Sequence, residues 1–339
     1  MKFFSLKAIS AAFVLSLIVM VLTAIAYFFY DTNRPFGKEG ETVLIDIPRG
    51  YSFVKIAKLL HTQGVVRDEL SFYLLSMSKG VVHRIKAGEY EFGQPMSPRD
   101  ILDKLVKGEI KYYRVVIPED LNVMEIAERL NQFGLIHKKK FMDLSENKAF
   151  LASLGITGDS IEGYLFPETY LFNRSMGDRQ IMVRMVDEFR RHATPERIER
   201  ANELGMTAHQ WVTMASLIGK ETGYSREKGM ISSVFHNRIK KGMRLQSDPT
   251  AVYHMKDFTG PILRSHLALD SPYNTYRING LPPGPISNPG IDSLMAAIYP
   301  ASGEFLYFVS KKDGTHFFSF HYSSHLQAIR KYQTSGKKE

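Results

Sequence analysis

Cysteine is absent from all 339 residues of the sequence. Its absence excludes disulfide scaffolds, thiolate zinc sites, iron–sulfur clusters and cysteine nucleophiles together. It leaves the redox compartment open, because a chain of this length can bury a core that needs no disulfide. Among the remaining side chains, a carboxylate is the catalytic group that we expect.

Acidic residues are fewer than basic ones, 35 against 44, and the formal net charge is +9. Such a surplus suits nucleic acid, an acidic membrane surface or an anionic polymer. Hydrophobic residues make up 44% of the chain, which excludes a disordered protein that cannot bury enough apolar surface to offset the entropy of ordering. The length indicates about two domains at roughly 150 residues each.

Only one long apolar run is present. The 23 positions from Ala8 to Tyr30 carry no charge, and as a helix they span about 35 Å, enough for a hydrocarbon core of about 30 Å. A cleaved secretory signal would be shorter and would end in small residues, whereas aromatic residues occupy 27–30. We therefore predict an uncleaved anchor, with Lys2 and Lys7 on the cytoplasmic side by the positive-inside rule.

This anchor determines where the rest of the chain is expected to lie. Residues 1–30 are predicted to form a cytoplasmic stub and a single transmembrane helix in the inner (cytoplasmic) membrane. A polar linker is expected at 31–40 and a polar tail at 334–339. The body between them then lies outside the cytoplasm, a location that argues against nucleic acid as a partner.

A strand-like segment followed by proline and a helix occurs twice, seventy positions apart. The strands are predicted at 43–47 and 113–117. The helix after each has apolar residues at i, i+3, i+4 and i+7, the pattern of one buried face. The matching positions are Phe53, Ile56, Ala57 and Leu60 in the first copy and Val123, Ile126, Ala127 and Leu130 in the second. A strand at 86–92 and a helix at 100–107, which Ser97 and Pro98 begin, complete the order strand, helix, helix, strand, helix. We therefore predict a small α+β module over 41–112 and a second repeat-like connecting segment over 113–160.

One helix is predicted in the segment 207–223, with a capping box at its first residues and Gly223 as its stop. Glu221 follows Leu217 by four positions and lies on the same apolar stripe. Burial and the helix dipole both disfavour its charge, so both raise its pKa toward the range of a general acid. Taken alone, this stretch favours a glutamate that merely pairs with Lys220 or Arg226 at the end of a helix.

The loops after this helix concentrate side chains that suit a carbohydrate. Amides and carboxylates hydrogen-bond sugar hydroxyls, and aromatic rings stack on sugar faces. We expect the following residues to line a glycan groove: Asn237, Gln246, Asp248, Tyr253, Asn274 and Tyr276. A P-loop, a dinucleotide fingerprint and an HExxH motif are absent, and the histidines lack metal-ligand spacing. We therefore predict neither a metal nor a cofactor.

Several motifs resemble, in order, those of the membrane-anchored endolytic murein transglycosylases, the YceG-like family. They are VTMASLIGKET at 212–222, the pair Asn237-Arg238, MRLQSDPTAVY at 243–253, YNTY at 273–276 and GLPPGPISNPG at 280–290. The block IEGYLFPETY at 161–170 and the C-terminal FLYFV with Ser324-His325 are also similar to the family's pattern, and KAGEYEF at 86–92 to its LysM-like part. The resemblance therefore implies an α+β fold with an anchor helix, a LysM-like module and an α+β catalytic domain over 161–333.

The resemblance implies Glu221 as the catalytic residue, the second acid of an E-K-E-like motif, and adds Arg238 and His325 to the substrate-binding residues. Two positions depart from the family's pattern. Gly219 stands where the first acid of that motif is expected, and a glycine inside a helix costs about 1 kcal/mol against alanine, which indicates close packing or bending. Asp120 stands where a glycine is common, and we expect it to alter only a turn.

The implied activity is cleavage of the MurNAc-GlcNAc β-1,4 bond in nascent peptidoglycan strands, which leaves 1,6-anhydroMurNAc ends and limits strand elongation. One carboxylate suffices, because the muramic acid's own 6-hydroxyl attacks the anomeric carbon. Two alternatives stay open: a muramidase-type hydrolase that uses Asp248 as a second carboxylate, and a non-catalytic, membrane-tethered glycan-binding or scaffold protein. Peptidoglycan synthases are partners that the resemblance implies.

Overall fold

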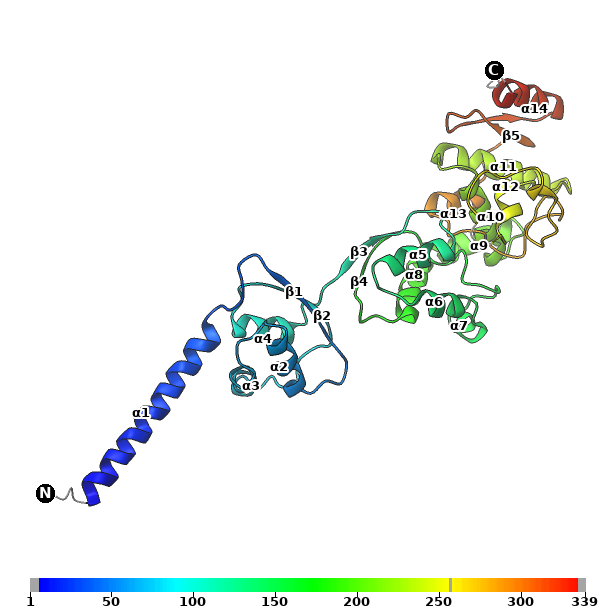
Figure 1. The fold of residues 1–339 in the computed structure, drawn as a ribbon. Helices are drawn as coiled ribbons and strands as arrows, with labels where there is room; N and C mark the ends of the chain where they lie inside the picture. Colours follow the sequence, from blue (N-terminus) through cyan, green and yellow to red (C-terminus); the bar gives the residue numbers. More distant parts are fainter. Residues whose placement is uncertain (1–5, 256–257, 335–339) are drawn as a thin grey trace. The chain divides into compact units, whose positions relative to one another are not determined.

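The computed structural model describes residues 6–255 and 258–334 and divides into two compact units (Figure 1). The N-terminal unit contains the residues before Arg114 together with Asn173–Ser175. The C-terminal unit contains Arg114–Phe172 and the residues from Met176 on. Helices and strands are mixed in both, as expected for an α+β protein.

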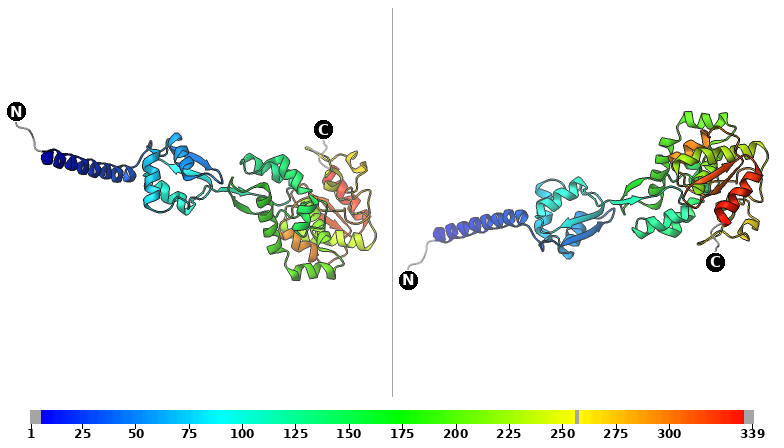
Figure 2. Two further views of the ribbon diagram at one scale, coloured as in Figure 1. Left: turned by 90° about the horizontal axis from the view of Figure 1, so that it is seen from below. Right: turned by 90° about the horizontal axis from the view of Figure 1, so that it is seen from above.

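The chain begins with one long apolar helix, α1 (Leu6–Asn33), drawn in dark blue without a break in Figures 1 and 2. Its segment Ser10–Asn33 has a mean hydropathy of 2.5 over its most apolar window, and that window is not buried against the protein. Within the described part of the chain it is the one helix long and apolar enough to cross a membrane. A membrane anchor fits both its length and its exposed apolar surface.

The rest of the N-terminal unit has the predicted order strand, helix, helix, strand, helix. The elements are β1 (Thr42–Ile47), α2 (Phe53–Thr62), α3 (Glu69–Ser78), β2 (Gly88–Gly93) and α4 (Pro98–Lys107). β1 and β2 pair antiparallel, with Thr42 opposite Gly93 and Ile47 opposite Gly88. The two strands and three helices share one apolar core, in which Phe72, Tyr90 and Phe92 are fully buried.

Residues 31–40 are attached to this unit, in contrast to the free polar linker that the sequence suggested. Asp31 and Thr32 are each 2% exposed, and the carboxylate of Asp31 pairs with Arg67 at 3.0 Å. Phe36 exchanges two backbone hydrogen bonds with Met96, of 2.9 and 3.1 Å. The polar composition of 31–40 predicted a linker. Within the unit, however, the carboxylate of Asp31 is paired with Arg67, and the backbone groups of Phe36 are hydrogen-bonded as in a strand.

The predicted repeat corresponds to two similar helices, α2 in the N-terminal unit and α5 (Val123–Gln132) in the C-terminal unit. All eight of the matched apolar residues are buried. Each helix is followed by a glycine in the left-handed region, Gly64 with φ of 70° and Gly134 with φ of 64°. Glycine reverses the chain there without the steric penalty of a Cβ.

The C-terminal unit begins with a two-stranded sheet and the helices around it. These elements are β3 (Tyr113–Val116), α5, α6 (Lys138–Ser145), α7 (Lys148–Ser153), β4 (Thr169–Phe172), α8 (Asp178–His192) and α9 (Pro195–Glu203). β3 pairs with β4. The unit therefore holds the second repeat-like segment together with the segment that carries Glu221.

A buried helix organises the remainder of the C-terminal unit. It is α10 (Ala208–Glu221), and its residues 211–219 are all buried. The elements around and after it are α11 (Ser225–Lys240), α12 (Asp248–Val252), the 3-10 turn η1 (His266–Ala268), α13 (Ile291–Ile298), the antiparallel hairpin of β5 (Tyr307–Ser310) and β6 (His316–Ser319), α14 (Tyr322–Ile329) and the π-helical turn η2 (Arg330–Thr334). α10 packs against α11, α12 and α13, and the indole of Trp211 donates a 2.8 Å hydrogen bond to the carbonyl of Leu294 in α13.

Both ends of α10 can be compared with the cap and the stop predicted from the sequence. Its first turn has the predicted capping box, in which Thr207 and Gln210 bond each other's backbone amides. The helix ends at Glu221, because Thr222 is extended with φ of −151°. Glu221 is the last helical residue, and Gly223 directly follows the C-cap residue Thr222, where a stop is expected, but without a left-handed φ. The side chain of Glu221 projects where the helix gives way to loop.

Candidate active site

Glu221 lies at the C-terminal end of α10 and is partly exposed. The apolar residues before it anchor the helix in the core and hold its end in place. The hydroxyl of Ser247, a fully buried residue, donates a 2.5 Å hydrogen bond to Oε1 of Glu221. A buried donor thus holds the carboxyl group of a residue that is itself partly exposed at the end of α10.

Burial raises the pKa of Glu221 to about 7. The carboxylate of Asp248 raises it as well, while the hydrogen bond from Ser247 and the positive charge of Arg238 lower it. The direction agrees with the sequence-based expectation, and burial is its main cause. A carboxyl group that is half protonated near neutral pH can both donate and accept a proton.

Arg238 contacts the loop that carries Ser247. It lies in α11, is 6% exposed, and donates hydrogen bonds from Nη1 to the carbonyl of Leu245 at 2.6 Å and from Nε to the carbonyl of Leu306 at 2.7 Å. Its guanidinium group also lies 5.5 Å above the ring of Tyr307. Arg238 therefore fixes the loop before Ser247 and places a positive charge near Glu221.

The segment after this loop brings further predicted residues toward Glu221. Asp248 is exposed at the start of α12 and accepts a 2.5 Å hydrogen bond from the hydroxyl of Tyr276. Negative charge on Asp248 and Glu221 contributes to a raised pKa of Tyr276, although burial is the larger cause. Gln246, beside Ser247, has an exposed side chain and a left-handed φ of 52°. Asp248, Tyr276 and Arg238 thus place charged and hydrogen-bonding groups near the carboxyl of Glu221.

Three of the predicted glycan-binding side chains instead bond the protein itself. Asn274 is fully buried and donates from Nδ2 to the carbonyls of Leu267 and Leu269. Asn237 donates from Nδ2 to two carbonyls of the segment before β5. The hydroxyl of Tyr253 donates to Glu162 at 3.1 Å. These hydrogen bonds hold the loops in shape, and the place of the three residues in a glycan groove stays a prediction.

His325, the last predicted residue, lies in α14 and stacks on the ring of Tyr307 at 5.1 Å between centroids. Burial lowers its pKa, and the charge of Arg238, which also lies near the ring of Tyr307, acts in the same direction. Its Nδ1 is buried and lacks a hydrogen-bond partner among residues 6–255 and 258–334. Arg238, Tyr307 and His325 thus connect α11, β5 and α14.

Two residues that sequence reasoning did not select support the same region. Ser247 bonds Glu221 directly, as described above. Glu162, only 4% exposed, accepts hydrogen bonds from the backbone of Val123, the amide of Asn288 and the hydroxyl of Tyr253. Burial raises the pKa of Glu162 to about 7. The block IEGYLFPETY was recognisable as a motif, but only the fold shows that its glutamate joins three distant segments.

The two positions that depart from the family's pattern meet in the structure. A Cβ built on Gly219 would lie 1.8 Å from Oδ1 of Asp120, so the Asp120 carboxylate fills the space of a side chain at 219. Oδ1 is buried and has no hydrogen-bond partner within the described ranges, and burial raises the pKa of Asp120 to about 6. The expectation that Asp120 alters only a turn is therefore wrong, and Gly219 reflects close packing.

An ion pair lies beside this contact. The ammonium of Lys228 in α11, whose side chain is 3% exposed, bonds the carboxylate of Glu119 at 3.1 Å. The positive charge of Lys228 also lowers the pKa of Asp120 against the effect of burial. The backbone of Asp120 donates to the carbonyl of Asn288 at 2.9 Å. The loop 119–122 is thereby fastened to α10, α11 and the segment before α13.

Among the described residues, three or more histidine, aspartate or glutamate side chains never gather in a way that would hold a metal ion. The groups around Glu221 are a serine, an arginine, a tyrosine and one further carboxylate. They suit proton transfer and the binding of polar or positively charged atoms.

Comparison with known proteins identifies the family of this chain. The family model described as "YceG-like family" matches residues 45–331. An endolytic murein transglycosylase of Bacillus subtilis is 32% identical over 321 residues, which cover 89% of this chain and 88% of the relative. One from Streptococcus pneumoniae is 28% identical over 88% of this chain, which spans 61% of that longer protein.

A solved structure is also similar. The crystal structure of a yceG-like protein from Listeria monocytogenes aligns with a TM-score of 0.59 at 32% identity. The alignment covers 86% of this chain and all of the other. The matched regions include the N-terminal strands and helices as well as α10 and the loops around Glu221. The chain belongs to the YceG-like family.

Proposed function

We propose that this protein is an endolytic murein transglycosylase that cleaves the MurNAc-GlcNAc β-1,4 bond of peptidoglycan strands and leaves 1,6-anhydroMurNAc ends. The names of its relatives support this activity. The observation that carries it is Glu221, a partly exposed carboxyl group with a pKa of about 7 at the end of a rigid helix. Such a group is protonated in a large fraction of molecules at neutral pH and is reachable by a polymer.

The proposed reaction uses Glu221 twice. Its protonated carboxyl donates a proton to the glycosidic oxygen while the bond between that oxygen and C1 of the muramic acid breaks. The 6-hydroxyl of the same sugar then attacks C1 and forms the 1,6-anhydro ring, and its proton passes to the Glu221 carboxylate. The acid is regenerated and water is not consumed, so a second catalytic carboxylate is not needed.

Positive charge develops on the sugar ring as the bond breaks. We propose that the exposed carboxylate of Asp248 faces this charge and is held in position by the hydroxyl of Tyr276. The exposed Gln246 is placed to bond sugar hydroxyls beside it. Asn237, Tyr253 and Asn274 contribute through the loops that they fasten, and Arg238 and His325 through the stack on Tyr307.

The competing reaction is hydrolysis, in which Asp248 activates a water molecule. The chemistry of the new ends distinguishes the two, because a hydrolytic reducing end is one water heavier than an anhydro end. Mass spectrometry of fragments released from intact glycan strands is expected to show anhydro ends. Reducing ends throughout would establish hydrolysis, and intact strands would favour a glycan-binding protein without catalysis.

The hydrogen bond from Ser247 to Glu221 leads to a prediction about the pH dependence of kcat/KM. The acid role needs protonated Glu221, so kcat/KM is expected to fall as the pH rises above about 7. Ser247 stabilises the ionised form and so lowers this pKa. Ser247→Ala should raise it, and the alkaline decline of kcat/KM should move to higher pH. A profile that keeps its wild-type position in the variant would show that Glu221 is not the group that titrates.

The N-terminal unit is proposed to be the LysM-like, glycan-binding module that the resemblance implies. A cleft of about 390 Å³ opens between the start of α2 and the segment before β2. Aromatic and apolar side chains line it, among them Tyr51, Phe53, Tyr73, Val82 and Ile85. Aromatic rings in an open cleft suit stacking against sugar faces.

Tyr51, 44% exposed at the rim of this cleft, provides the test. Tyr51→Ala is expected to weaken the binding of glycan strands to the full-length protein, with KM raised and kcat unchanged, because the reacting groups lie in the other unit. Lys58→Ala removes an exposed side chain from α2, the helix that follows Tyr51, and is the matched control. Equal affinity of the two variants would contradict a glycan site in this cleft.

Membrane anchoring by α1 is part of the same proposal and rests on its apolar length. A cytoplasmic N-terminus, the inner membrane as location and peptidoglycan synthases as partners stay predictions from the sequence.

A further inference from the structure

α3 is apolar on two opposite faces. One face places Phe72 and Leu75 in the core of the N-terminal unit. The other presents Leu70, Leu74 and Met77, which are 61%, 45% and 53% exposed. Their spacing of four and three residues places these three side chains on one stripe of the helix. An apolar stripe on the outer face of a helix is typical of a surface that contacts a partner or lipid.

α2 and α4, the other two helices around this core, have ordinary polar outer faces. α2 exposes Lys55 and Lys58 and a single large apolar side chain, Val54. α4 exposes Arg99 and Lys107. The stripe Leu70–Leu74–Met77 is therefore a property of α3 and not of the unit as a whole.

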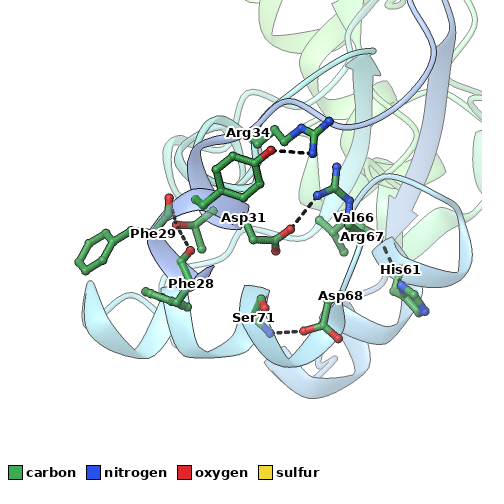
Figure 3. A network of polar contacts seen from close by, with 11 residues as sticks. Phe28, Phe29, Asp31, Arg34, His61, Val66, Arg67, Asp68 and Ser71 are labelled. Carbon is green, nitrogen blue, oxygen red and sulfur yellow. Dashed lines mark hydrogen bonds and ion pairs between the residues drawn. The ribbon is translucent and has the colours of Figure 1, made fainter. Parts of the chain in front are cut away.

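The start of α3 lies next to the end of the apolar helix α1. Arg67, just before the N-cap residue Asp68, forms a 3.0 Å ion pair with Asp31 in the last turn of α1 (Figure 3). Asp31 is 2% exposed, so this ion pair is sheltered at the junction. Phe28 of α1 packs against the unit's core, and α1 contacts both α3 and α4. The start of α3 is thus fastened to the point where the apolar surface of α1 ends.

We propose that the stripe Leu70–Leu74–Met77 is inserted into the surface of the membrane that α1 crosses, with lipid chains as its occupant. The proposal rests on the proposed anchoring by α1. The exposed apolar surface of α1 continues through Phe29 and Tyr30, which are 58% and 57% exposed, and the stripe on α3 extends this surface. An amphipathic helix in this position buries its apolar face about 5–10 Å into the boundary between headgroups and chains. The N-terminal unit is then in direct contact with the surface of the bilayer and is not connected to it through α1 alone.

The absence of cysteine makes the test direct, because one introduced cysteine carries the only label. Leu74→Cys and Met77→Cys probe the stripe, Lys58→Cys on α2 is the water-exposed control, and Val19→Cys in α1 reports on anchoring. Each full-length variant is labelled with an environment-sensitive fluorophore and reconstituted in vesicles of phosphatidylethanolamine and phosphatidylglycerol. Quenching by spin-labelled lipid is compared with quenching by iodide.

Labels at 74 and 77 are expected to be quenched several-fold more by the lipid quencher than the label at 58, which iodide should quench. If labels at 74 and 77 behave like the one at 58 while the label at 19 is in lipid, the seating of α3 is wrong and the anchor stands. If the label at 19 is also outside the lipid, anchoring itself fails, and the seating of α3 falls with it. Glycan cleavage by the same variants is measured as well, so that a failure of the proposed enzymatic activity is recognised separately from a failure of the membrane contact.

Discussion

Glu221→Gln is expected to abolish the release of anhydromuropeptides from glycan strands while leaving the fold intact. Glutamine keeps the shape of glutamate but can neither give a proton to the glycosidic oxygen nor take one from the 6-hydroxyl. Loss of general acid–base catalysis lowers rates by about 10²–10⁴-fold. Product release by wild type and variant, followed by mass spectrometry, measures the loss and the chemistry of the ends together.

The same substitution makes a prediction about stability that separates folding from catalysis. The pKa of Glu221 is raised in the fold to about 7 from its ordinary value of 4.5. The folded protein therefore binds more protons than the unfolded chain between these values, and the stability from this group is lost as the pH rises through that window. Glu221→Gln should lack this loss in urea unfolding at pH 5 and pH 8. An inactive variant with a wild-type or flatter stability profile locates the defect in catalysis, whereas wild-type activity would end the assignment of Glu221.

Gly219→Glu is expected to cost both stability and activity, because even its Cβ would overlap the carboxylate of Asp120. Overpacking of a dense interior typically costs about 1–3 kcal/mol, and a second carboxylate would be buried beside the first. The strain would fall two residues before Glu221. Urea unfolding and the rate of glycan cleavage measure the two effects.

Asp120→Gly in the same chain should reverse much of that damage. It empties the space that a side chain at 219 needs, and it places glycine at a left-handed position, where Asp120 has φ of 64°. The pair is therefore expected to be non-additive, with a coupling of about 0.5–3 kcal/mol as found for residues in contact. Gly229→Ala, in α11, is the matched helical glycine control, because an added Cβ there would lie in ordinary contact with Ala301 at 3.7 Å. If the effects of the two single substitutions on stability simply add, Asp120 does not occupy the space of a side chain at 219.

Local patterns in the sequence were reliable where one helix or strand decides its own structure. The apolar spacing of Ile56 and Leu60, and of Ile126 and Leu130, identified the buried faces of α2 and α5. Ser97 with Pro98 marked the start of α4, and the capping box at Thr207 marked that of α10. These features are encoded within a few residues, because caps and amphipathic faces depend on neighbours in the chain.

Residues whose role depends on distant partners were harder to interpret. Asn274 and Asn237 were expected to meet sugar, but their amides bond backbone carbonyls. An amide or hydroxyl has the same chemistry toward a ligand and toward a loop, so the residue type cannot distinguish the two. Ser247 went unselected for the same reason, since serine is common in loops and its hydroxyl becomes informative only beside Glu221.

By itself, the sequence determined the apolar anchor, the α+β mixture, the repeated helix and the position of Glu221 on a partly apolar stripe. Each depends on periodicity or composition over one short segment. Only the tertiary structure decided that residues 31–40 belong to the N-terminal unit, that Ser247 bonds Glu221, and that Asp120 fills the space beside Gly219. Those contacts join residues from 26 to 99 positions apart, and side chains so separated meet only after the packing of whole helices has brought their loops together.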